Sequence, residues 1–529
     1  MSPVEKTYPA ETASISTMVD DAIQMLADRD INKKLLVEYR LLLEEIGIKM
    51  VEKAAPGAQF SLRMTRRTGV YSLKISCAGA PIVLERENED DIGGRILEEY
   101  ANCLGQSYMA GVNIITFSTS TPSNSTLYKC CISMLLASAV GAILLLTLPG
   151  NTVTWIDENI LNPFVILFSN FMSTIAMPVA FFSLATFIIS FQMSLDRDPR
   201  FLRLSIRYIF TSIVAYLVGM GAALLVVRCG FYTELTAYRT ANTNFMGSSL
   251  RDLITSAVGS NIIEPFTLKN PLPMLTLAVI VGFAAANYFG PGGDTTRQAV
   301  NNVNAMFCKM LDLVYTTIPF FLFIAFLSGW LMNGFAYVKT LLSALVLIVL
   351  PMIGMLCFYA LQVRFSGIRL RDFLRDYGDL IAENFKIGSN IQALPYNKRM
   401  LYRRTRVPGT FLYDGLKLGT TMNMDGNCLM IATFITVFVR ACGISIPAGQ
   451  YVAIFLVLLL VSVGAPNQPG SFLLVMVVLM DFMGISTQLY GYVLIIEAVT
   501  GKFYSFINSL GDVVTMIIEV HRLKKTEKV

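Results

Sequence analysis

The chain has 529 residues, of which 54% are hydrophobic and 15% are charged, whereas an average soluble protein carries roughly 25% charged residues. The formal net charge of +5 is small, so the composition gives no sign of a nucleic-acid partner. The single histidine, His521, excludes a histidine-based metal centre and a serine–histidine hydrolase. The nine cysteines include no CxxC pair and predict reduced thiols.

Residues 1–118 hold many acidic and basic side chains and are predicted to form a small soluble α+β domain, followed by a polar linker at 119–126. The residues before 30 lack the apolar core of a signal peptide, so we expect this domain in the cytoplasm. Apolar spacing and alternation predict, in chain order, a helix over 35–51, strands over 60–66 and 70–76, a helix over 93–110 and a strand over 113–118.

Two segments of this domain, 41–49 and 77–81, resemble the ATP-binding fold of anti-sigma-factor kinases and histidine kinases. The resemblance would place the magnesium-binding asparagine of those proteins at Lys49 and their adenine-binding aspartate at Cys77, which argues against ATP hydrolysis. Two interpretations stay open, a degenerate nucleotide-binding domain used for regulation and an unrelated small α+β domain.

From residue 127 onward, long apolar stretches alternate with short polar loops. A bilayer core about 30 Å thick needs about 20 apolar residues in each helix that crosses it. The stretches that predict such helices are 127–149, 163–193, 203–228, 273–290, 299–333, 338–362, 409–442 and 489–519.

Two further regions do not fit a simple span. Residues 373–402 are only weakly hydrophobic, and the short apolar runs 452–463 and 472–485 are separated by residues 464–470, which are rich in glycine and proline. Half-length helices on either side of such a tip predict a re-entrant hairpin, which is tolerated at membrane depth inside protein or beside a water-filled cavity. The alternative is one long span kinked by its prolines.

Basic side chains gather in 194–207, 364–375, 398–406 and the tail. With eight spans and two re-entrant hairpins, all of these clusters fall on the side of the N-terminus, which identifies that side as the cytoplasm. We therefore predict a mainly α-helical protein of the plasma membrane with eight transmembrane helices and two re-entrant hairpins. Its transmembrane domain would cover 127–522, and both termini, including a tail at 523–529, would be cytoplasmic.

Two acidic residues lie inside apolar segments, where an unpaired charge costs about 2.5–3.5 kcal/mol. Asp425 lies in the stretch 419–427, which combines amides, hydroxyls and glycines, while Asn508 and Asp512 are four residues apart on one helix face. Further oxygens in the third span come from Tyr208, Thr211 and Ser212. Hard cations such as Na⁺ bind oxygen ligands of these kinds, so we predict a cation site; helix packing by polar residues is the alternative.

The run Asn423-Met424-Asp425-Gly426 resembles the signature of the glutamate transporter and dicarboxylate/amino acid:cation symporter family. The resemblance extends over about 127–522 and includes, in the same order as in the family, Met177-Pro178, 208–212, Leu394-Pro395, 462–464, 469–470, Asn508, Gly511 and Asp512. It implies a homotrimer with a scaffold and a transport domain that moves elevator-fashion. The transport domain would hold both hairpins and the last two spans.

The positions that bind cations in this family are retained, so the resemblance implies coupling to Na⁺. The first site would consist of Tyr208, Thr211, Ser212, Asn423 and Asp425; the second of Gly419, Asn423, Asn508 and Asp512; and the third of Thr421, Met424, Ser462, Val463 and Ala465.

The positions that bind the organic substrate are altered. Family members that take acidic amino acids offer an aspartate and an arginine from the last helix, and this chain has Gly501 and Tyr504 there. Without the arginine, a second carboxylate of the solute has no bidentate partner. The resemblance places the solute among Ser389, Asn390, Asn427, Gly464, Asn467, Gln468, Gly501, Tyr504, Ser505 and Asn508.

These amides and the phenol suit an uncharged or singly charged polar solute. Glu497 and Lys502 would pair across the last helix or reach the same pocket. We therefore predict a Na⁺-driven symporter, surrounded by membrane lipid, and not an enzyme. The alternatives are a transporter-derived receptor that signals through 1–118, shown by saturable binding without uptake, and a channel, shown by currents without coupled solute.

Overall fold

The computed structural model describes the chain apart from residues 1–3, 29–32, 68–69, 83–96, 98–103, 110, 119–123, 198, 231–250, 252–254, 268–270, 289, 291, 406, 408, 444–447, 464–469, 484, 486–488 and 527–529. The chain divides into two compact units, residues 1–125 and 126–529. Each unit has its own hydrophobic core.

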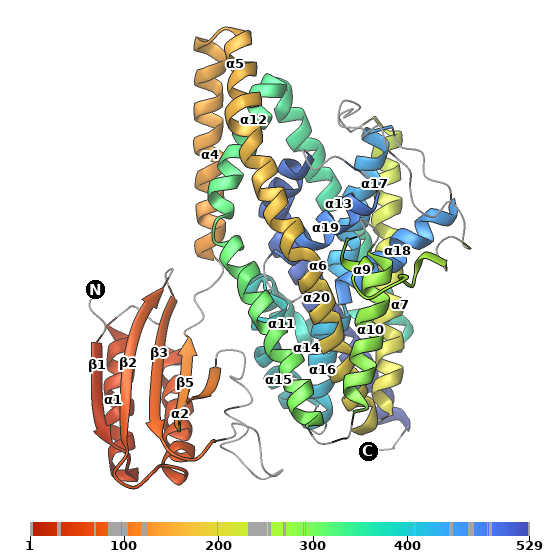
Figure 1. Ribbon diagram of the computed structural model, residues 1–529. Coiled ribbons are helices and arrows are strands. Elements are labelled where there is room, and N and C mark those ends of the chain that lie inside the picture. Colours follow the sequence, from red (N-terminus) through yellow and green to blue (C-terminus); the bar gives the residue numbers. More distant parts are fainter. Residues whose placement is uncertain are drawn as a thin grey trace. The chain divides into compact units, whose positions relative to one another are not determined.

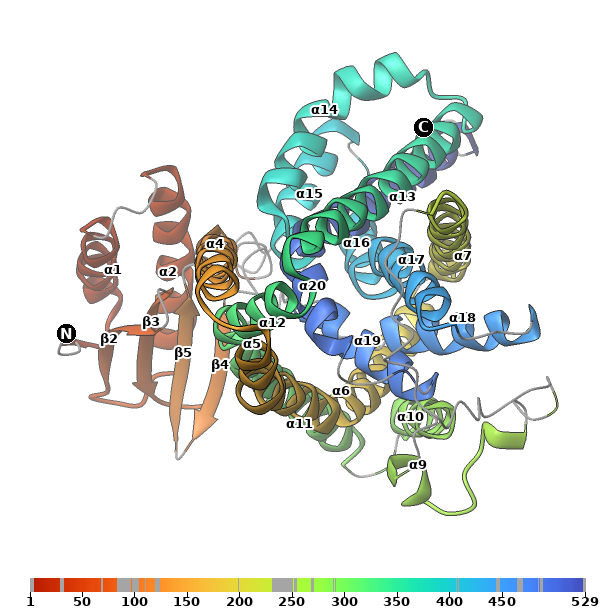
Figure 2. The same cartoon turned by 90° about the horizontal axis from the view of Figure 1, so that it is seen from above.

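The first unit contains an antiparallel sheet with strand order β1-β2-β3-β5-β4 and two helices on one of its faces (Figure 2). Its elements are β1 (Val4–Pro9), α1 (Thr12–Ala27), α2 (Lys33–Glu52), β2 (Gln59–Arg67), β3 (Val70–Ala78), β4 (Leu104–Met109) and β5 (Val112–Ser118). Alternate strand residues, such as Ile75 opposite Ile115, are buried in a core that includes Leu42 and Ile46 of α2.

The helix predicted over 35–51 and the strands predicted over 60–66, 70–76 and 113–118 are confirmed. The helix predicted over 93–110 is wrong at its end, because 104–109 forms β4 and pairs with β5. Pairing with a neighbouring strand provides hydrogen bonds that local helical spacing does not reveal, and the glycine at position 105 weakens a helix there.

The second unit is a bundle of helices (Figure 1). Its elements are α4 (Asn124–Thr147), α5 (Gly150–Ile156), the π-helical η2 (Asp157–Leu161), α6 (Asn162–Arg197), α7 (Arg200–Arg228), α9 (Glu264–Thr267), α10 (Leu272–Ala286), α11 (Gly293–Tyr315), α12 (Ile318–Asn333), η4 (Gly334–Ala336), α13 (Tyr337–Phe365), α14 (Leu370–Ile387), α15 (Asn390–Thr405), α16 (Gly409–Met422), α17 (Asp425–Ala441), α18 (Ala448–Val463), α19 (Ser471–Phe482) and α20 (Tyr490–Thr526).

Helix α17 lies at the centre of this bundle, and every one of its residues except Arg440 is buried (Figure 2). It packs closely on α7, where a side chain at Gly219 would collide with the carbonyl oxygen of Leu429. It also packs on α20, where a side chain at Gly426 would collide with the carbonyl oxygen of Tyr504. Glycines at these contacts bring the backbones of three helices together.

Six helices of the described residues are long and apolar enough to cross a membrane, or seven if the bent pair α11–α12 counts as one span. Helix α10 is the remaining predicted span, and its 15 residues extend roughly 22 Å, less than a bilayer core of about 30 Å. The mainly helical character of this unit is thus confirmed, and the count of eight spans stays a prediction.

The structure corrects three local predictions. The span predicted over 299–333 is bent by 49° between α11 and α12, since Pro319 has no amide hydrogen with which to continue the first helix. The stretch 150–160, predicted as a loop, is helical as α5 and η2. Helix α20 runs on to Thr526, through most of the predicted tail.

Both regions predicted as hairpins form pairs of short helices. In the first, α14 ends at Gly388, whose φ of 60° suits glycine, and α15 begins two residues later. In the second, α18 and α19 lie on either side of 464–469, which are outside the described residues. The predicted tip residues Gly464, Ala465, Asn467 and Gln468 are therefore not placed.

Candidate cation and solute site

The candidate site lies around a break in the helical chain between α16 and α17. Asn423 and Met424 separate the two helices, and the amide of Asn423 still donates to the carbonyl of Gly419 at 2.8 Å. Beyond the break, the amide of Gly426 donates to Oδ1 of Asn508 on α20 at 2.6 Å. Such breaks free backbone groups for other partners and bring side chains to the middle of a bundle.

Asp425 begins α17 and is completely buried. Its Oδ1 accepts a hydrogen bond from Ser212 on α7 at 2.9 Å, and its Oδ2 accepts one from Tyr359 on α13 at 2.6 Å. Both donors are neutral hydroxyls, and no ion pair of the described residues involves this carboxylate. A negative charge at this position thus has hydrogen bonds but no protein counter-charge.

Asp512 of α20 is the second buried acid, with 1% of its surface exposed. Its Oδ1 accepts a hydrogen bond from Nδ2 of Asn423 at 3.0 Å. Among the described residues its Oδ2 has no hydrogen-bond partner, although the side chain of Asn390 lies close to the carboxylate. A buried oxygen without a partner is uncommon in a folded protein and is a suitable ligand for a cation.

Asn423 connects the two acids. Its Oδ1 accepts a hydrogen bond from Thr211 at 3.1 Å, and its Nδ2 donates to Asp512 and, at 3.3 Å, to the carbonyl of Asn508. A side chain at Gly511 would come within 2.5 Å of this Nδ2 and within 2.9 Å of Oδ2 of Asp425. The glycine therefore lets the backbone of α20 approach both groups.

Tyr208 and Gly419 complete this cluster of oxygens. A side chain at Gly419 would lie 2.7 Å from Oδ1 of Asp512 and 2.7 Å from the hydroxyl of Tyr208. The tyrosine hydroxyl donates to the carbonyl of Gly415 at 3.2 Å. The structure thus brings together the residues predicted for the first two cation sites, which are Tyr208, Thr211, Ser212, Gly419, Asn423, Asp425, Asn508 and Asp512.

The residues predicted for the third cation site are less closely joined. Thr421 donates its hydroxyl to the carbonyl of Leu418 in its own helix at 2.9 Å. The sulfur of Met424 accepts a hydrogen bond from Nδ2 of Asn508 at 3.7 Å. Ser462 and Val463 end α18 and are buried, but among the described hydrogen bonds none joins them to Thr421.

Several residues predicted for the solute lie beside the cation cluster. Asn427 accepts a hydrogen bond from Asn508 at 3.4 Å and donates one to Ser471 at 3.5 Å. Asn390 is buried, whereas Ser389 is half-buried and accepts a hydrogen bond from the amide of Gln392 at 3.5 Å. Ser505 is also half-buried on α20.

Glu497 is a third buried acid of this unit, with 2% of its surface exposed. Both of its carboxylate oxygens accept hydrogen bonds from the hydroxyl of Tyr504 at 3.1 Å, and Oε1 accepts one from the amide of Gly470 at 3.2 Å. Lys502 lies instead over the ring of Phe385, 5.3 Å from its centroid. Of the two alternatives for Glu497 and Lys502, pairing between them is therefore contradicted, and the carboxylate instead binds the residue that precedes α19.

Another set of hydrogen bonds ties the first hairpin to α20. Asn384 of α14 donates to Asn397 of α15 at 2.8 Å, Asn397 donates to Ser509 of α20 at 3.2 Å, and Ser509 donates back to Asn384 at 2.7 Å. All three side chains are buried, so this closed ring fixes the hairpin beside the candidate site. Neither the ring nor Tyr359 is predicted from the sequence.

Comparisons with known proteins point to one family. The model described as the sodium:dicarboxylate symporter family matches residues 127–521. Excitatory amino acid transporter 3 of Mus musculus is 27% identical over 196 residues, which cover 36% of each chain. The C4-dicarboxylate transport protein of Bacillus subtilis is 24% identical over 274 residues, covering 50% of this chain and 63% of that protein.

A serine/threonine transporter of Bifidobacterium adolescentis is 23% identical over 384 residues, covering 71% of this chain and 85% of that protein. With the mouse and Bacillus subtilis proteins, by contrast, the matched stretch spans less than two thirds of the relative's length. The similarity is thus low in identity and falls on the helical unit.

Proposed function

Because the chain belongs to the sodium:dicarboxylate symporter family and is a multi-pass membrane protein, we propose that it is a Na⁺-coupled symporter of a small polar organic solute. The observation that supports this proposal most strongly is the buried carboxylate of Asp512, which lies beside the cluster around Asp425 and whose Oδ2 has no hydrogen-bond partner in the part of the chain that the structure describes. Two buried acids without a basic partner favour an arriving cation as the missing counter-charge.

The chemistry of the cluster suits Na⁺. Carboxylates, hydroxyls, amide oxygens and backbone carbonyls are the oxygen ligands that hard cations take. In this proposal Na⁺ is a transported substrate, held by the oxygens of Asp425, Asp512, Asn423 and Thr211 and by nearby backbone carbonyls. Its entry would neutralise charge inside the bundle and thereby favour closure of the second hairpin over the solute.

The names of these three relatives refer to excitatory amino acids, C4-dicarboxylates, and serine and threonine. The side chains of this chain favour a solute without a second carboxylate. The hydroxyl of Tyr504 on α20 donates a hydrogen bond to Glu497, and Gly501 has no charged side chain. Neither residue therefore offers a positive charge to a second carboxylate of the solute. The amides of Asn390, Asn427 and Asn508 suit an uncharged or singly charged solute with hydroxyl or amide groups.

The proposed movement is the one that the family resemblance implies. The helix pairs α14–α15 and α18–α19 would be re-entrant hairpins that move with α16–α17 and α20, elevator-fashion, against a scaffold within a homotrimer. The hydrogen-bonded ring of Asn384, Asn397 and Ser509 supports joint movement of the first hairpin with α20. We also propose the plasma membrane as its location, with both termini cytoplasmic.

The test is solute uptake into proteoliposomes of the purified full chain under an inward Na⁺ gradient, with a matched K⁺ gradient as control. The solute panel contains serine, threonine, glutamine, aspartate and succinate. We expect uptake of a neutral or singly charged solute that requires Na⁺ and is lost in Asp512→Asn. Binding of a solute without uptake would instead support a receptor, and uptake that is equal in K⁺ would refute Na⁺ coupling.

A further inference from the structure

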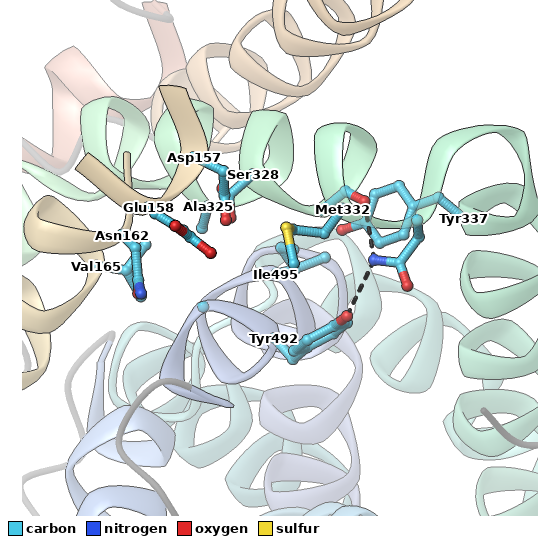
Figure 3. A pocket seen from close by; sticks show the side chains of 13 residues that line it. Asp157, Glu158, Asn162, Val165, Ala325, Ser328, Met332, Tyr337, Tyr492 and Ile495 are labelled. Carbon is cyan, nitrogen blue, oxygen red and sulfur yellow. Dashed lines mark hydrogen bonds between the residues drawn. The ribbon is translucent and has the colours of Figure 1, made fainter. Parts of the chain in front are cut away.

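A cavity of about 330 Å³ lies apart from the candidate cation site, between η2, α6, α12, α13 and α20 (Figure 3). It shares no lining residue with that site. It meets α20 at residues 491–495, near the start of the helix, whereas Asn508 lies roughly 20 Å further along the helix axis. Its volume is in the range of ligand pockets for small organic molecules.

Two adjacent acids line this cavity. Asp157 is 95% buried, and its Oδ1 has no hydrogen-bond partner among the described residues, while Ser328 lies close to the same carboxylate. Glu158, the next residue, also lines the cavity. Both acids belong to the π-helical turn η2, in which the amide of Asn162 donates a hydrogen bond to the carbonyl of Asp157, five residues earlier. Single π-turns of this kind are frequent at functional sites. The described residues of the lining include no lysine or arginine, so the negative charge has no basic partner among them.

A second buried polar group without a partner faces the same cavity. Tyr337 is completely buried, and no described residue forms a hydrogen bond with its hydroxyl. A side chain at Gly329 would lie 2.4 Å from the ring of this tyrosine, so glycine is required to admit it. On the neighbouring wall, Asn333 donates to the hydroxyl of Tyr492 at 3.3 Å (Figure 3).

We propose that this cavity is a second ligand site, for a small organic molecule that carries a protonated amine. The acids Asp157 and Glu158 would bind the ammonium group, and the hydroxyl of Tyr337 would meet a polar substituent. The apolar side chains of Val165, Met332 and Ile495 would cover the carbon skeleton. A bare metal ion fits less well, because the described residues include no group of three or more His, Cys, Asp or Glu able to hold one.

Such a ligand would act on transport without occupying the transport site. The ligand would contact α20, which belongs to the proposed transport domain. It would also contact α6 and α12, which lie outside that domain. A molecule bound between α20 and the pair α6 and α12 would restrain the movement of the transport domain against the scaffold. With the C-terminal end of α20 in the cytoplasm, the cavity at its other end would be reached from outside the cell.

The experiment measures the thermal midpoint of the purified full chain in a K⁺ buffer without Na⁺, against increasing 2-phenylethylamine or its uncharged counterpart 2-phenylethanol. We expect the amine to raise the midpoint and the alcohol to leave it unchanged. In Asp157→Asn the half-saturating amine concentration should rise about tenfold or more, since a charge-assisted hydrogen bond is lost. The matched control Asp312→Asn, outside the cavity, should respond like the natural chain.

Equal shifts with amine and alcohol, no shift with either, or an unchanged response in Asp157→Asn would each overturn the proposal. If Asp157→Asn does not fold, an amine bearing a photoreactive diazirine replaces it as the test on the natural chain. Its label must fall within 155–165, 325–337 or 490–495, which hold the lining residues, and labelling elsewhere counts against the site. Asp425→Asn separates this proposal from the symporter, because it should lose the response to Na⁺ and keep the response to the amine.

Discussion

Tyr359 donates a hydrogen bond of 2.6 Å to Oδ2 of Asp425 and thereby joins α13 to the break between α16 and α17. The same hydroxyl lies 3.3 Å from the carbonyl of Ile507 on α20, so this side chain of α13 contacts two other parts of the candidate site. Because it is neutral, it stabilises the carboxylate without cancelling the charge that a cation would meet.

Replacing this tyrosine tests that role. In Tyr359→Phe, one oxygen of a buried carboxylate loses its donor, and we expect the free energy of unfolding without Na⁺ to fall by about 1.5–3 kcal/mol. Saturating Na⁺ should recover part of the loss. Thermal midpoints with and without Na⁺ provide the measurement, and Tyr402→Phe, at a position 49% exposed, is the control. A midpoint equal to that of the natural chain would show that the contact contributes nothing.

Neutralising Asp512 should separate stability from ion binding. In Asp512→Asn, the amide can no longer serve as a charged ligand, so stabilisation by Na⁺ should disappear; at 100 times Kd that stabilisation amounts to about 2.7 kcal/mol. In K⁺ alone the variant should be at least as stable as the natural chain, because a buried charge has been removed. The matched change Asp372→Asn, at a side chain of α14 that is 42% exposed, should leave the Na⁺ response intact. A Na⁺ response that survives in Asp512→Asn would place the ion elsewhere.

The side chain at 504 should decide whether a second carboxylate is accepted. Tyr504→Arg combined with Glu497→Gln would present a guanidinium that no longer pairs with an acid on its own helix, and such a group binds carboxylates bidentately. We expect this double variant to take up succinate in Na⁺, which the natural chain does not. Tyr504→Arg alone should do so poorly, since Glu497 would hold the guanidinium. Succinate uptake by the natural chain would contradict the proposed solute class.

The ring of Asn384, Asn397 and Ser509 should behave as one unit. Asn397→Ala leaves a buried donor and a buried acceptor without partners, so we expect it to destabilise the chain by about 1–3 kcal/mol. A double-mutant cycle between Asn384→Ala and Ser509→Ala should be strongly non-additive. Asn159→Ala, which removes an exposed bond to its own helix, is the control. Additive losses would show three independent contacts instead of a ring.

The helices and the buried acids were largely predictable, because apolar length and a carboxylate in an apolar run are local signals. The contacts of Glu497 were not. Five residues along a helix turn the side chain by about 140°, whereas seven return it to nearly the same face, which is why Tyr504 rather than Lys502 reaches the carboxylate. Tyr359 has no local signal at all, because a tyrosine in an apolar span is ordinary until its partner on another helix is known.

The complete enclosure of α17 has a consequence for how the protein is made. A helix with no lipid-facing side cannot settle in the bilayer as a finished span, because its partners α7 and α20 must already cover it. Of these two partners, α20 is synthesised after α17. Asp425 can therefore pack against Gly511 only after the ribosome has completed α20. Assembly of the candidate cation site is therefore a late event in biogenesis, because the helix that completes it is the last to be synthesised.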